Sequence, residues 1–350
     1  MKLFNILFTL FGVVTVIFFL FQILPGDPAR MMMDQNEDVE QLEIIKKKYG
    51  FDEPILNQYL YYLNDLSIIS IHSKNPEKIN FIRENKYSFT KIYDFQNSTL
   101  VLKFPYLRES YQRRGVKVST IIMDTFPNTV VLAISSILFA TVFGLLLGIL
   151  SALYKETLFD NSIQLFSTFG MSMPSFLSSI IFDWIFGFVL ADITGLNMTG
   201  SLFELDDFGD EYRLELKNLI LPSIVLGIRP IAVISMMMRN SLIETLKKNY
   251  VITAYAKGLS KSKVILNHCL KNSLNPVITA LSGWFASLLA GSVFVEYIFG
   301  WNGLGREIVN SLNLLDVPVI IGAVIVVSFS FIMINIFVDY VYKFLDPRIS

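Results

Sequence analysis

Six long apolar stretches divide the chain, and each is at least about as long as the roughly 20 residues with which a helix crosses a bilayer. In chain order they are Leu3–Leu24, Thr129–Leu153, Ser162–Leu190, Leu219–Met238, Pro276–Phe299 and Val317–Val341. Only 17% of the residues are charged, whereas an ordinary soluble domain has about 25%. The sequence therefore predicts an all-α integral membrane protein with six transmembrane helices.

The first stretch has a competing interpretation as a cleaved secretory signal, because Lys2 supplies a basic start. Leu3–Leu24 is longer than a signal core of about 7–15 residues, and no A-x-A-like cleavage site follows it. We therefore expect residues 1–24 to remain as the first transmembrane helix.

Two short patterns shape the later stretches. Gly144 and Gly148 form a G-x-x-x-G pattern that lets helices pack closely, with ordinary apolar filler as an equal alternative. Arg229-Pro230 interrupts the fourth stretch, where we expect a kink and where Arg229 needs an acid or a carbonyl as its partner.

Basic residues in short loops indicate the orientation. Seven of them lie between Arg239 and Lys271, where Glu244 is the only acid, whereas the loop 191–218 is acidic. We expect the lysine-rich loop to be cytoplasmic, and six spans then place both termini on the same side.

The segment 25–128 then lies outside the membrane. Apolar residues at helical spacing predict short helices over Asn36–Tyr49 and Ile55–Leu66. Residues 67–107 differ, because SFTKIYDFQNSTLVLKF is rich in the aromatic and β-branched residues that are typical of strands. We expect a small inserted subdomain at 67–107, with an irregular loop as the alternative, followed by a core of five helices over 129–350.

The cytoplasmic stretch 241–275 contains TAYAKGLSKSK, which begins at Thr253. We expect the fourth span to continue as helix to Lys257, Gly258 to end it, and a second helix to follow. Ala254 and Ala256 leave the first helix with a thin side that is open to contact. Two simpler interpretations remain: a basic loop that only fixes topology, and a lysine cluster that attracts anionic lipid.

The stretch NYVITAYAKGLSKSKVILNHCLKNSLNPVIT resembles the coupling loop of ABC importer permeases, most closely that of the dipeptide/oligopeptide/nickel branch. Further resembling stretches follow in the family's order: LPGDPA at Leu24–Ala29, YGFDEPILNQYLYYL at Tyr49–Leu63, FPNTVVLA at Phe126–Ala133, MPSF at Met173–Phe176, VEYIFGWNGLGRE at Val295–Glu307 and DPR at Asp346–Arg348. Each motif is weak alone, but the ordered set covers nearly the whole chain except Ser67–Leu107. The chain resembles the first of the two permease types of this family.

The resemblance implies the ABC type I importer permease fold in a bacterial cell membrane. It also implies a second homologous permease in a heterodimer, two ATPase subunits, an extracellular or lipid-anchored substrate-binding protein and contact with membrane lipid, without nucleic acid. ATP and Mg are then expected on the ATPase subunits. This chain has no G-x-x-x-x-G-K-[ST] phosphate loop, so we expect no cofactor, catalytic residue or enzyme activity on it. One cysteine and two distant histidines also make a metal site unexpected.

The resemblance assigns the coupling to the ATPase to six residues of the hairpin: Thr253, Ala254, Ala256, Lys257, Gly258 and Leu259. Four positions depart from the family pattern: Ile252 replaces an acid, Lys271 replaces a proline of the broader family although a basic residue is usual in the peptide branch, Met236 replaces an arginine that is often present, and Asn302 replaces a common proline. The loss of proline at Asn302 predicts a less rigid turn.

Asp183 lies inside the third stretch, where an acid costs about 2.5–3.5 kcal/mol on insertion scales. Our hypothesis is that it faces the pathway and attracts a cationic group. The alternatives are a lysine or hydroxyl partner in the second permease, or a position near the outer surface. Ser172, Ser175 and Ser179 share one helical face and offer either substrate contacts or close helix packing.

The stretch FVEYIFGWNGLG predicts a re-entrant turn before the sixth span, because glycines break it repeatedly. Glu296, Trp301 and Asn302 are then candidates for an outer gate or a contact with the binding protein. A capped turn without such a role is the simpler alternative.

The function predicted from the resemblance is a permease subunit that forms half of the pathway for peptides or related small solutes. A nickel, metallophore or glutathione importer of the same family is the alternative. A self-contained secondary transporter is disfavoured by the lack of an inverted repeat. A membrane enzyme is disfavoured because the spans lack a paired-acid or Cys/His constellation.

Overall fold

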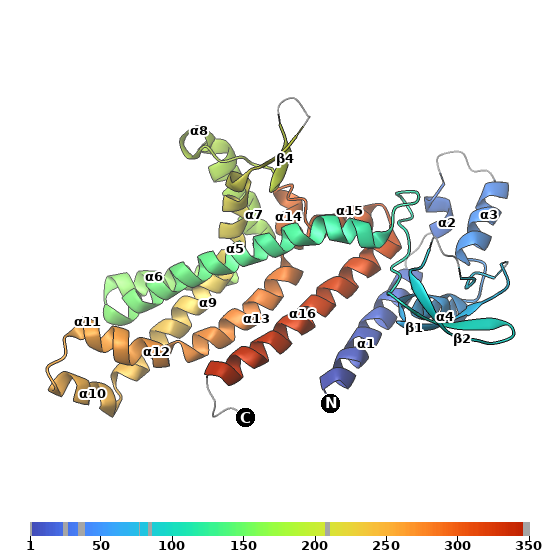
Figure 1. Cartoon of the computed structure of the whole chain (residues 1–350). Coiled ribbons are helices and arrows are strands. Elements are labelled where there is room, and N and C mark those ends of the chain that lie inside the picture. Colours follow the sequence, from blue (N-terminus) through green and yellow to red (C-terminus); the bar gives the residue numbers. More distant parts are fainter. Residues whose placement is uncertain are drawn as a thin grey trace. The chain divides into compact units, whose positions relative to one another are not determined.

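The structure, a computed structural model, describes residues 2–23, 27–33, 39–76, 78–82, 86–206 and 211–345 (Figure 1). The chain divides into two compact units. Unit 1 comprises Met1–Asp124 and Asn310–Ser328, and unit 2 comprises Thr125–Val309 and Phe329–Ser350. Two stretches that carry the family resemblance, Leu24–Gly26 and Asp346–Arg348, lie outside the described residues.

Unit 1 combines helices with a small sheet. Its own elements are α1 (Lys2–Ile23), α2 (Pro28–Met31), α3 (Val39–Tyr49), α4 (Ile55–Leu66), β1 (Ile69–Ser73), β2 (Phe89–Asp94) and β3 (Ser98–Lys103). It also contains the first turns of α5 (Val118–Leu153) and α16 (Val317–Leu345). The strands form an antiparallel sheet in the order β1-β3-β2, so the predicted strand content of 67–107 is present.

A buried polar cluster lies between α4 and this sheet. The Asp65 carboxylate accepts hydrogen bonds from the Tyr87 hydroxyl (2.7 Å) and from Nε of Arg108 (2.9 Å). Lys103 donates to the Asp65 carbonyl oxygen. Burial alone would raise the pKa of Asp65, but Arg108, Lys86 and these hydrogen bonds outweigh it and hold the pKa below its usual range. Burial lowers the pKa of Lys103 to about 8.

Unit 2 is built almost entirely of helices. It continues α5 and then contains α6 (Leu158–Ser172), α7 (Ser175–Phe182), the π-helix η1 (Asp183–Val189), α8 (Ala191–Thr194), β4 (Phe203–Leu205), β5 (Tyr212–Leu214), the 3-10 helix η2 (Leu216–Leu219) and α9 (Ile220–Leu246). It goes on with α10 (Asn249–Ala256), α11 (Lys261–Val264), the π-helix η3 (Ile265–Cys269), α12 (Leu270–Ser273), α13 (Asn275–Gly291), α14 (Val293–Ile298), most of α15 (Leu304–Asn313) and the rest of α16.

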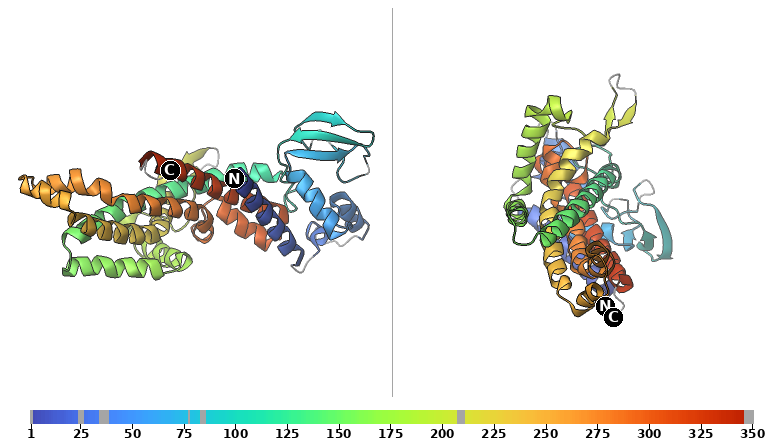
Figure 2. Two further views of the ribbon diagram at one scale, coloured as in Figure 1. Left: turned by 90° about the horizontal axis from the view of Figure 1, so that it is seen from below. Right: turned by 90° about the vertical axis from the view of Figure 1, so that its left-hand side faces the viewer.

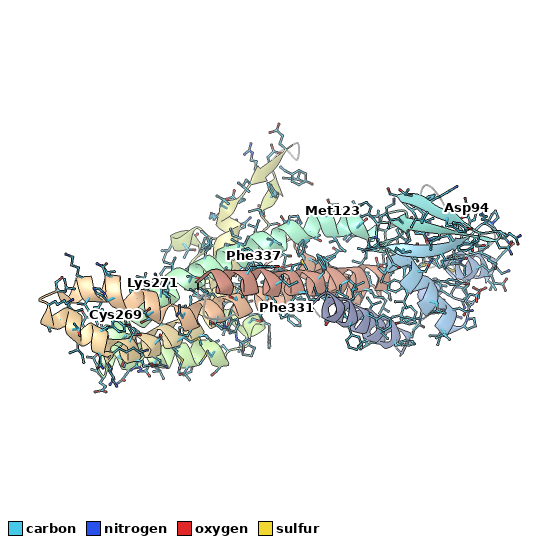
Figure 3. All side chains as sticks on the ribbon, turned by 60° about the horizontal axis from the view of Figure 1, so that its bottom comes forward. Asp94, Met123, Cys269, Lys271, Phe331 and Phe337 are labelled. Atoms are coloured by element: carbon cyan, nitrogen blue, oxygen red, sulfur yellow. The ribbon has the colours of Figure 1, made fainter. Side chains whose placement is uncertain are left out.

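Three helical stretches of the described chain are long and apolar enough to cross a membrane: Val118–Leu153, Leu216–Leu246 and Val317–Val338. Two bent pairs pass the same test together, namely Leu158–Ser172 with Ser175–Val189 and Lys261–Ser273 with Asn275–Gly291. The described residues therefore offer three spans, or up to five if each bent pair is one span, and α1 adds a shorter apolar helix over Ile6–Gln22. Large apolar side chains such as Phe331 and Phe337 stand exposed along α16, as lipid-facing residues do (Figure 3).

The third predicted span is not one straight helix. A bend of 109° separates α6 from α7. Pro174 causes the break, because it has no backbone N–H and forces the residue before it, Met173, into an extended conformation (ψ 129°). The expectation that Ser172, Ser175 and Ser179 share one helical face is therefore wrong, since Ser172 ends α6 and the other two lie on α7.

The close packing predicted for Gly144 and Gly148 is confirmed. A Cβ atom at Gly144 would lie 2.7 Å from the Ile234 side chain, and one at Gly148 would lie 2.6 Å from the Ser235 carbonyl oxygen. Both glycines thus let α5 approach the backbone of α9. The apolar core beside them includes Ile234, Met238 and Leu242 of α9.

Candidate coupling hairpin and the polar sites of the bundle

The lysine-rich hairpin, α10 to α12, forms one end of unit 2, beside the end of α9 and the start of α13 (Figure 2). The fourth span does not continue into it as one helix, contrary to expectation. α9 ends at Leu246, and Lys248 adopts an extended conformation (φ −75°, ψ 144°) before α10 begins at Asn249. A two-residue joint, Lys247-Lys248, therefore separates the hairpin from the span.

Gly258 makes the predicted turn. Its φ of +82° lies in the left-handed region that glycine adopts without strain, and its N–H donates to the Tyr255 carbonyl (2.9 Å). A Cβ atom there would meet nothing within 4 Å, so the requirement for glycine is one of backbone conformation and not of space. The second helix then starts at Lys261 after a Ser260 cap position.

The two faces of α10 differ. Val251 and Ala254 are buried against Val264 and Cys269 of the second arm. Ala254 thus packs inside the hairpin, and only Ala256 of the two predicted alanines lies open. Thr253, Lys257 and Gly258 are also exposed, and Leu259 is half-buried against the hairpin core.

The exposed face of α10 carries large side chains that the sequence reasoning missed. Tyr250, Ile252 and Tyr255 are 40%, 58% and 41% exposed. Ile252 was noted only as a departure from the family pattern. Spacing could not have found them, because Val251 with Ala254 and Ile252 with Tyr255 are both three apart and only the packing decides which pair faces inward.

A buried ion pair fixes the bundle next to the hairpin. Arg239, two turns before the end of α9, donates from Nε to Oδ1 of Asp160 (2.7 Å) and from Nη2 to Oδ2 (2.6 Å). The Asp160 side chain is fully buried and the Arg239 side chain is 15% exposed. This fork-to-fork geometry joins the first turn of α6 to α9.

The Asp160 carboxylate also accepts hydrogen bonds from neighbouring parts of the chain. The Ser151 hydroxyl on α5 donates to Oδ1, and the backbone N–H of Glu156 donates to Oδ2 (2.9 Å). Thr157 caps α6 by accepting from the Asp160 backbone N–H (3.3 Å). Three helices, α5, α6 and α9, thus meet at one carboxylate. Sequence reasoning missed this site, although Thr157-x-x-Asp160 has the spacing of a capping box.

Asp183 begins the π-helix η1 and is only 7% exposed. Among the described residues, no group donates a hydrogen bond to its Oδ1 atom. A Cβ atom at Gly187, one turn on, would lie 3.1 Å from that oxygen. Oδ1 is thus a buried acceptor without a donor in the described part of the chain, at a helix irregularity of the kind that recurs at functional sites.

The turn around Glu296 is held by hydrogen bonds to buried groups. Ser292 donates to Oε1 of Glu296 (2.7 Å), and the backbone N–H groups of Gly305 and Arg306 donate to Oε2 (2.7 and 3.2 Å). Trp301 is fully buried and donates from its indole nitrogen to the Asn128 carbonyl (3.1 Å). Of the three predicted outer residues, Asn302 alone is exposed.

Arg229 has the carbonyl partner that its place in an apolar helix requires. Its Nη2 atom donates to the Met171 carbonyl near the end of α6 (3.5 Å). Pro230 lies inside α9, which remains one helix from Ile220 to Leu246.

Comparison with known proteins identifies the family of this chain. Residues 144–350 match the family described as binding-protein-dependent transport system inner membrane component, and residues 1–81 match the N-terminal component of such membrane proteins. The chain belongs to this family. It is a multi-pass protein of the cytoplasmic membrane and the permease subunit of an ATP-driven importer, which works with another permease, an ATPase and a binding protein.

Curated relatives match over almost their full length. A di/tripeptide transport system permease protein of Pseudomonas aeruginosa is 32% identical, over 97% of this chain and 95% of that one. A glutathione transport system permease protein of Escherichia coli is 30% identical, over 99% and 97%. An inward-facing structure of the MetNI methionine ABC transporter has a similar fold, with a TM-score of 0.53 and 14% identity over 65% of this chain and 97% of that one.

Proposed function

We propose that the chain is one of two different permeases of a peptide importer and forms half of its pathway. Two ATPase subunits, which bind ATP and Mg, lie on the cytoplasmic side, and an extracellular or lipid-anchored binding protein delivers the solute. Six spans cross the membrane, with both termini in the cytoplasm. They are α1, α5, the bent pair α6–α7, α9, the bent stretch that ends in α13, and α16.

The observation that carries the coupling role is the exposed surface of α10. Ile252 and Tyr255 lie on its open side, whereas the Tyr250 hydroxyl accepts a hydrogen bond from Asn272 of α12 (2.8 Å). Large side chains with an apolar body are the residues that anchor protein interfaces, while exposed lysines such as Lys257 supply a charged rim. We propose that α10 docks on the ATPase through this face, and that Thr253, Ala256 and Lys257 line the contact.

Movement of the ATPases would reach the spans through α9. The Lys247-Lys248 joint is short, and the Arg239–Asp160 pair ties α9 to α5 and α6 just before it. A push on α10 is therefore expected to move these helices together. Gly258 and Leu259 keep the two arms of the hairpin packed, so the push is not absorbed within it.

The docking proposal is tested by replacing Ile252 and Tyr255 together with serine. Loss of the exposed apolar area should reduce recovery of the ATPases with the purified permease and lower uptake. The control replaces Lys261 and Lys263, which are exposed on the second arm, with serine. If the Ile252 and Tyr255 double variant still co-purifies with the ATPases and takes up solute at the parent rate, α10 is not the docking helix.

The solute that we propose is a short peptide, because the relatives matched over nearly all of this chain include permeases named for di/tripeptides and for glutathione, itself a peptide. Nickel or a metallophore is the alternative within the branch. Competition of labelled dipeptide uptake by unlabelled dipeptide, glutathione and nickel separates these solutes. Uptake of nickel without uptake of either peptide would contradict the proposal.

We further propose that Asp183 serves the pathway. A buried carboxylate with one oxygen that has no donor among the described residues attracts an ammonium group. Ser175 and Ser179, on the helix that leads into η1, extend polar groups along the same segment, and Ser172 precedes the bend. Asp183→Asn should reduce uptake of peptides with an added positive charge more than uptake of neutral ones, and Asp183→Glu should retain the preference. Equal loss for both peptide classes would point to a structural role.

At the outer end, we propose that Asn302 contacts the binding protein while Glu296 and Trp301 hold its loop in place. The exposure of Asn302 and the burial of the other two support this division. Asn302→Arg should weaken stimulation by the binding protein without loss of assembled complex. If Asn302→Arg left stimulation by the binding protein unchanged, the proposed contact would be wrong.

A further inference from the structure

Three large apolar side chains of α4 are exposed. Ile55, Leu56 and Leu60 are 50%, 64% and 53% exposed. The sequence ILNQYLYYLN from Ile55 to Asn64 contains no charged residue. An exposed, uncharged helix face is unusual in a segment that lies wholly in water.

The polar side chains of α4 are turned back onto the protein. Asn57 donates to the Glu53 carboxylate (3.0 Å), and Gln58 donates to the Glu53 carbonyl (2.8 Å). Asn64 both donates to the Ile71 carbonyl (3.1 Å) and accepts from the Ile71 N–H (3.0 Å). The exposed face is therefore left with apolar groups that need no water.

The face of α4 that carries Tyr59, which borders these exposed residues, packs against α1. The Tyr59 hydroxyl lies 2.6 Å from the Thr15 hydroxyl, and the Tyr59 ring lies 5.2 Å from the ring of Phe19. Thr15 stands eight residues before the end of α1 at Ile23, which is about 12 Å along a helix axis. α4 thus lies beside the apolar length of α1 and not beyond its end.

The contact of α4 with α16 places α4 at the same depth along the apolar helices as its contact with α1 does. Tyr59 and Tyr62 share a buried cluster with Ile321 of α16, against which Val317 and Ile325 also pack. Ile325 stands eight residues after the start of α16 at Val317, again about 12 Å along the axis. α16 is long and apolar enough to cross the membrane alone.

We infer that α4 is an interfacial helix embedded in the outer leaflet, with Ile55, Leu56 and Leu60 in contact with lipid. The lipid is the occupant because α1, which α4 contacts through Phe19 and Tyr59, itself exposes the apolar side chains of Val16, Phe19 and Leu20. Tyr61, which is half-buried, fits the aromatic belt of a membrane interface. The inference rests on the proposed role of α1 as a span.

Spin labels in the assembled importer test this placement. Cys269, the single cysteine, is replaced by serine, and one cysteine is introduced at a time by Leu56→Cys, Leu60→Cys, Leu20→Cys or Ile92→Cys. Leu20 reports the lipid-facing side of α1, and Ile92 on β2 is 52% exposed and serves as the matched control outside α4. The complex is reconstituted in phosphatidylethanolamine–phosphatidylglycerol vesicles. Collision rates with oxygen, which concentrates in lipid, and with a water-soluble nickel chelate are then compared.

The expected ratio of oxygen to nickel collisions at positions 56 and 60 equals that at position 20 and is several-fold above that at position 92. If the ratio at positions 56 and 60 equals that at position 92 while the ratio at position 20 remains high, α4 is not an interfacial helix. The proposed role of α1 as a span then still holds. Exclusion of both reagents from 56 and 60 also overturns it, since a protein then covers the face. A water-like ratio at 20 as well overturns the proposed span and the inference together.

Discussion

Arg239 and Asp160 lie 79 positions apart in the sequence and form a two-pronged hydrogen-bonded ion pair, with Nε–Oδ1 and Nη2–Oδ2 distances of 2.7 and 2.6 Å. Because the carboxylate is fully buried and also binds Ser151 and the Glu156 N–H, this pair is the point at which α5, α6 and α9 are joined. Its position before the Lys247-Lys248 joint makes it part of the path between the hairpin and the bundle.

Asp160→Asn should destabilise the permease strongly. Removal of one partner of a buried pair leaves the other charge uncompensated, at a cost of about 3–5 kcal/mol. The thermal unfolding midpoint of the purified complex measures the effect. Lys248→Gln is the control, because it breaks an exposed pair with Glu244 (3.4 Å) that should contribute about 1 kcal/mol or less. Equal midpoints for the two variants would show that Asp160 does not hold the helices together.

Gly258→Val should disturb the hairpin through its backbone alone. A side chain with Cβ at φ +82° costs roughly 1–2 kcal/mol, although open space surrounds the position. Gly258→Asn is the matched control, since asparagine tolerates this conformation. We expect Gly258→Val to reduce ATP-driven uptake, with Gly258→Asn close to the parent, as measured in reconstituted vesicles. Gly258→Trp should uncouple or block assembly because it adds bulk at the docking face, and normal transport by Gly258→Trp would contradict the coupling role.

Gly148→Ala should weaken the contact between α5 and α9. The new Cβ would lie 2.6 Å from the Ser235 carbonyl oxygen, so one helix must move, at a typical cost of about 1–3 kcal/mol. Gly283→Ala in α13 is the comparison, because nothing lies within 4 Å of its Cβ position. Helix propensity predicts that this second change is neutral or slightly stabilising. Thermal unfolding of both variants gives the answer, and the prediction fails if Gly148→Ala is tolerated as well as Gly283→Ala.

The sheet of unit 1 should lose stability in acid. The pKa of Asp65 is lower in the folded protein than in the unfolded chain, so its contribution is complete above the unfolded value of about 3.9 and is lost as the pH falls through the folded value. Amide hydrogen exchange in β1 and β3, corrected for intrinsic rates, should accelerate as the pH drops from about 5 to about 3. Asp65→Asn should exchange faster at neutral pH and lose this acid dependence. A variant with the parent's profile would exclude Asp65 as the cause.

Lys103 should make stability rise with pH as well, but at alkaline pH. Burial lowers its pKa to about 8, so the folded protein releases this proton before the unfolded chain does. Its contribution to the free energy of unfolding therefore rises between about pH 8 and the unfolded value of about 10.4. Lys103→Met should remove this rise, as seen in the same exchange experiment above pH 8.

Local patterns predicted the parts of the fold that local chemistry decides. Gly258 ends α10 because its backbone adopts the left-handed conformation. Gly144 and Gly148 permit close approach on one face of a helix. The strand content of 67–107 followed from its aromatic and β-branched residues. The residue types that favour these features are recognisable in short stretches of sequence, although their partners are not.

The remaining features depend on partners distant in sequence. Pro174 was visible, but the bend of 109° depends on how α7 packs against α9 and α14. Asp160 stood just outside the predicted third span, and nothing nearby in sequence points to Arg239. The inward direction of Ala254 likewise depends on Val264 and Cys269 across the Gly258 turn.

The break at Pro174 has an electrostatic consequence. α6 is a separate helix of 15 residues, so it ends with carbonyl groups that no further turn can satisfy and carries the negative end of a helix dipole there. Arg229 reaches this end through the Met171 carbonyl, and its positive charge balances the dipole. An arginine that looked costly inside an apolar helix is thus a counter-charge at the end of the neighbouring helix.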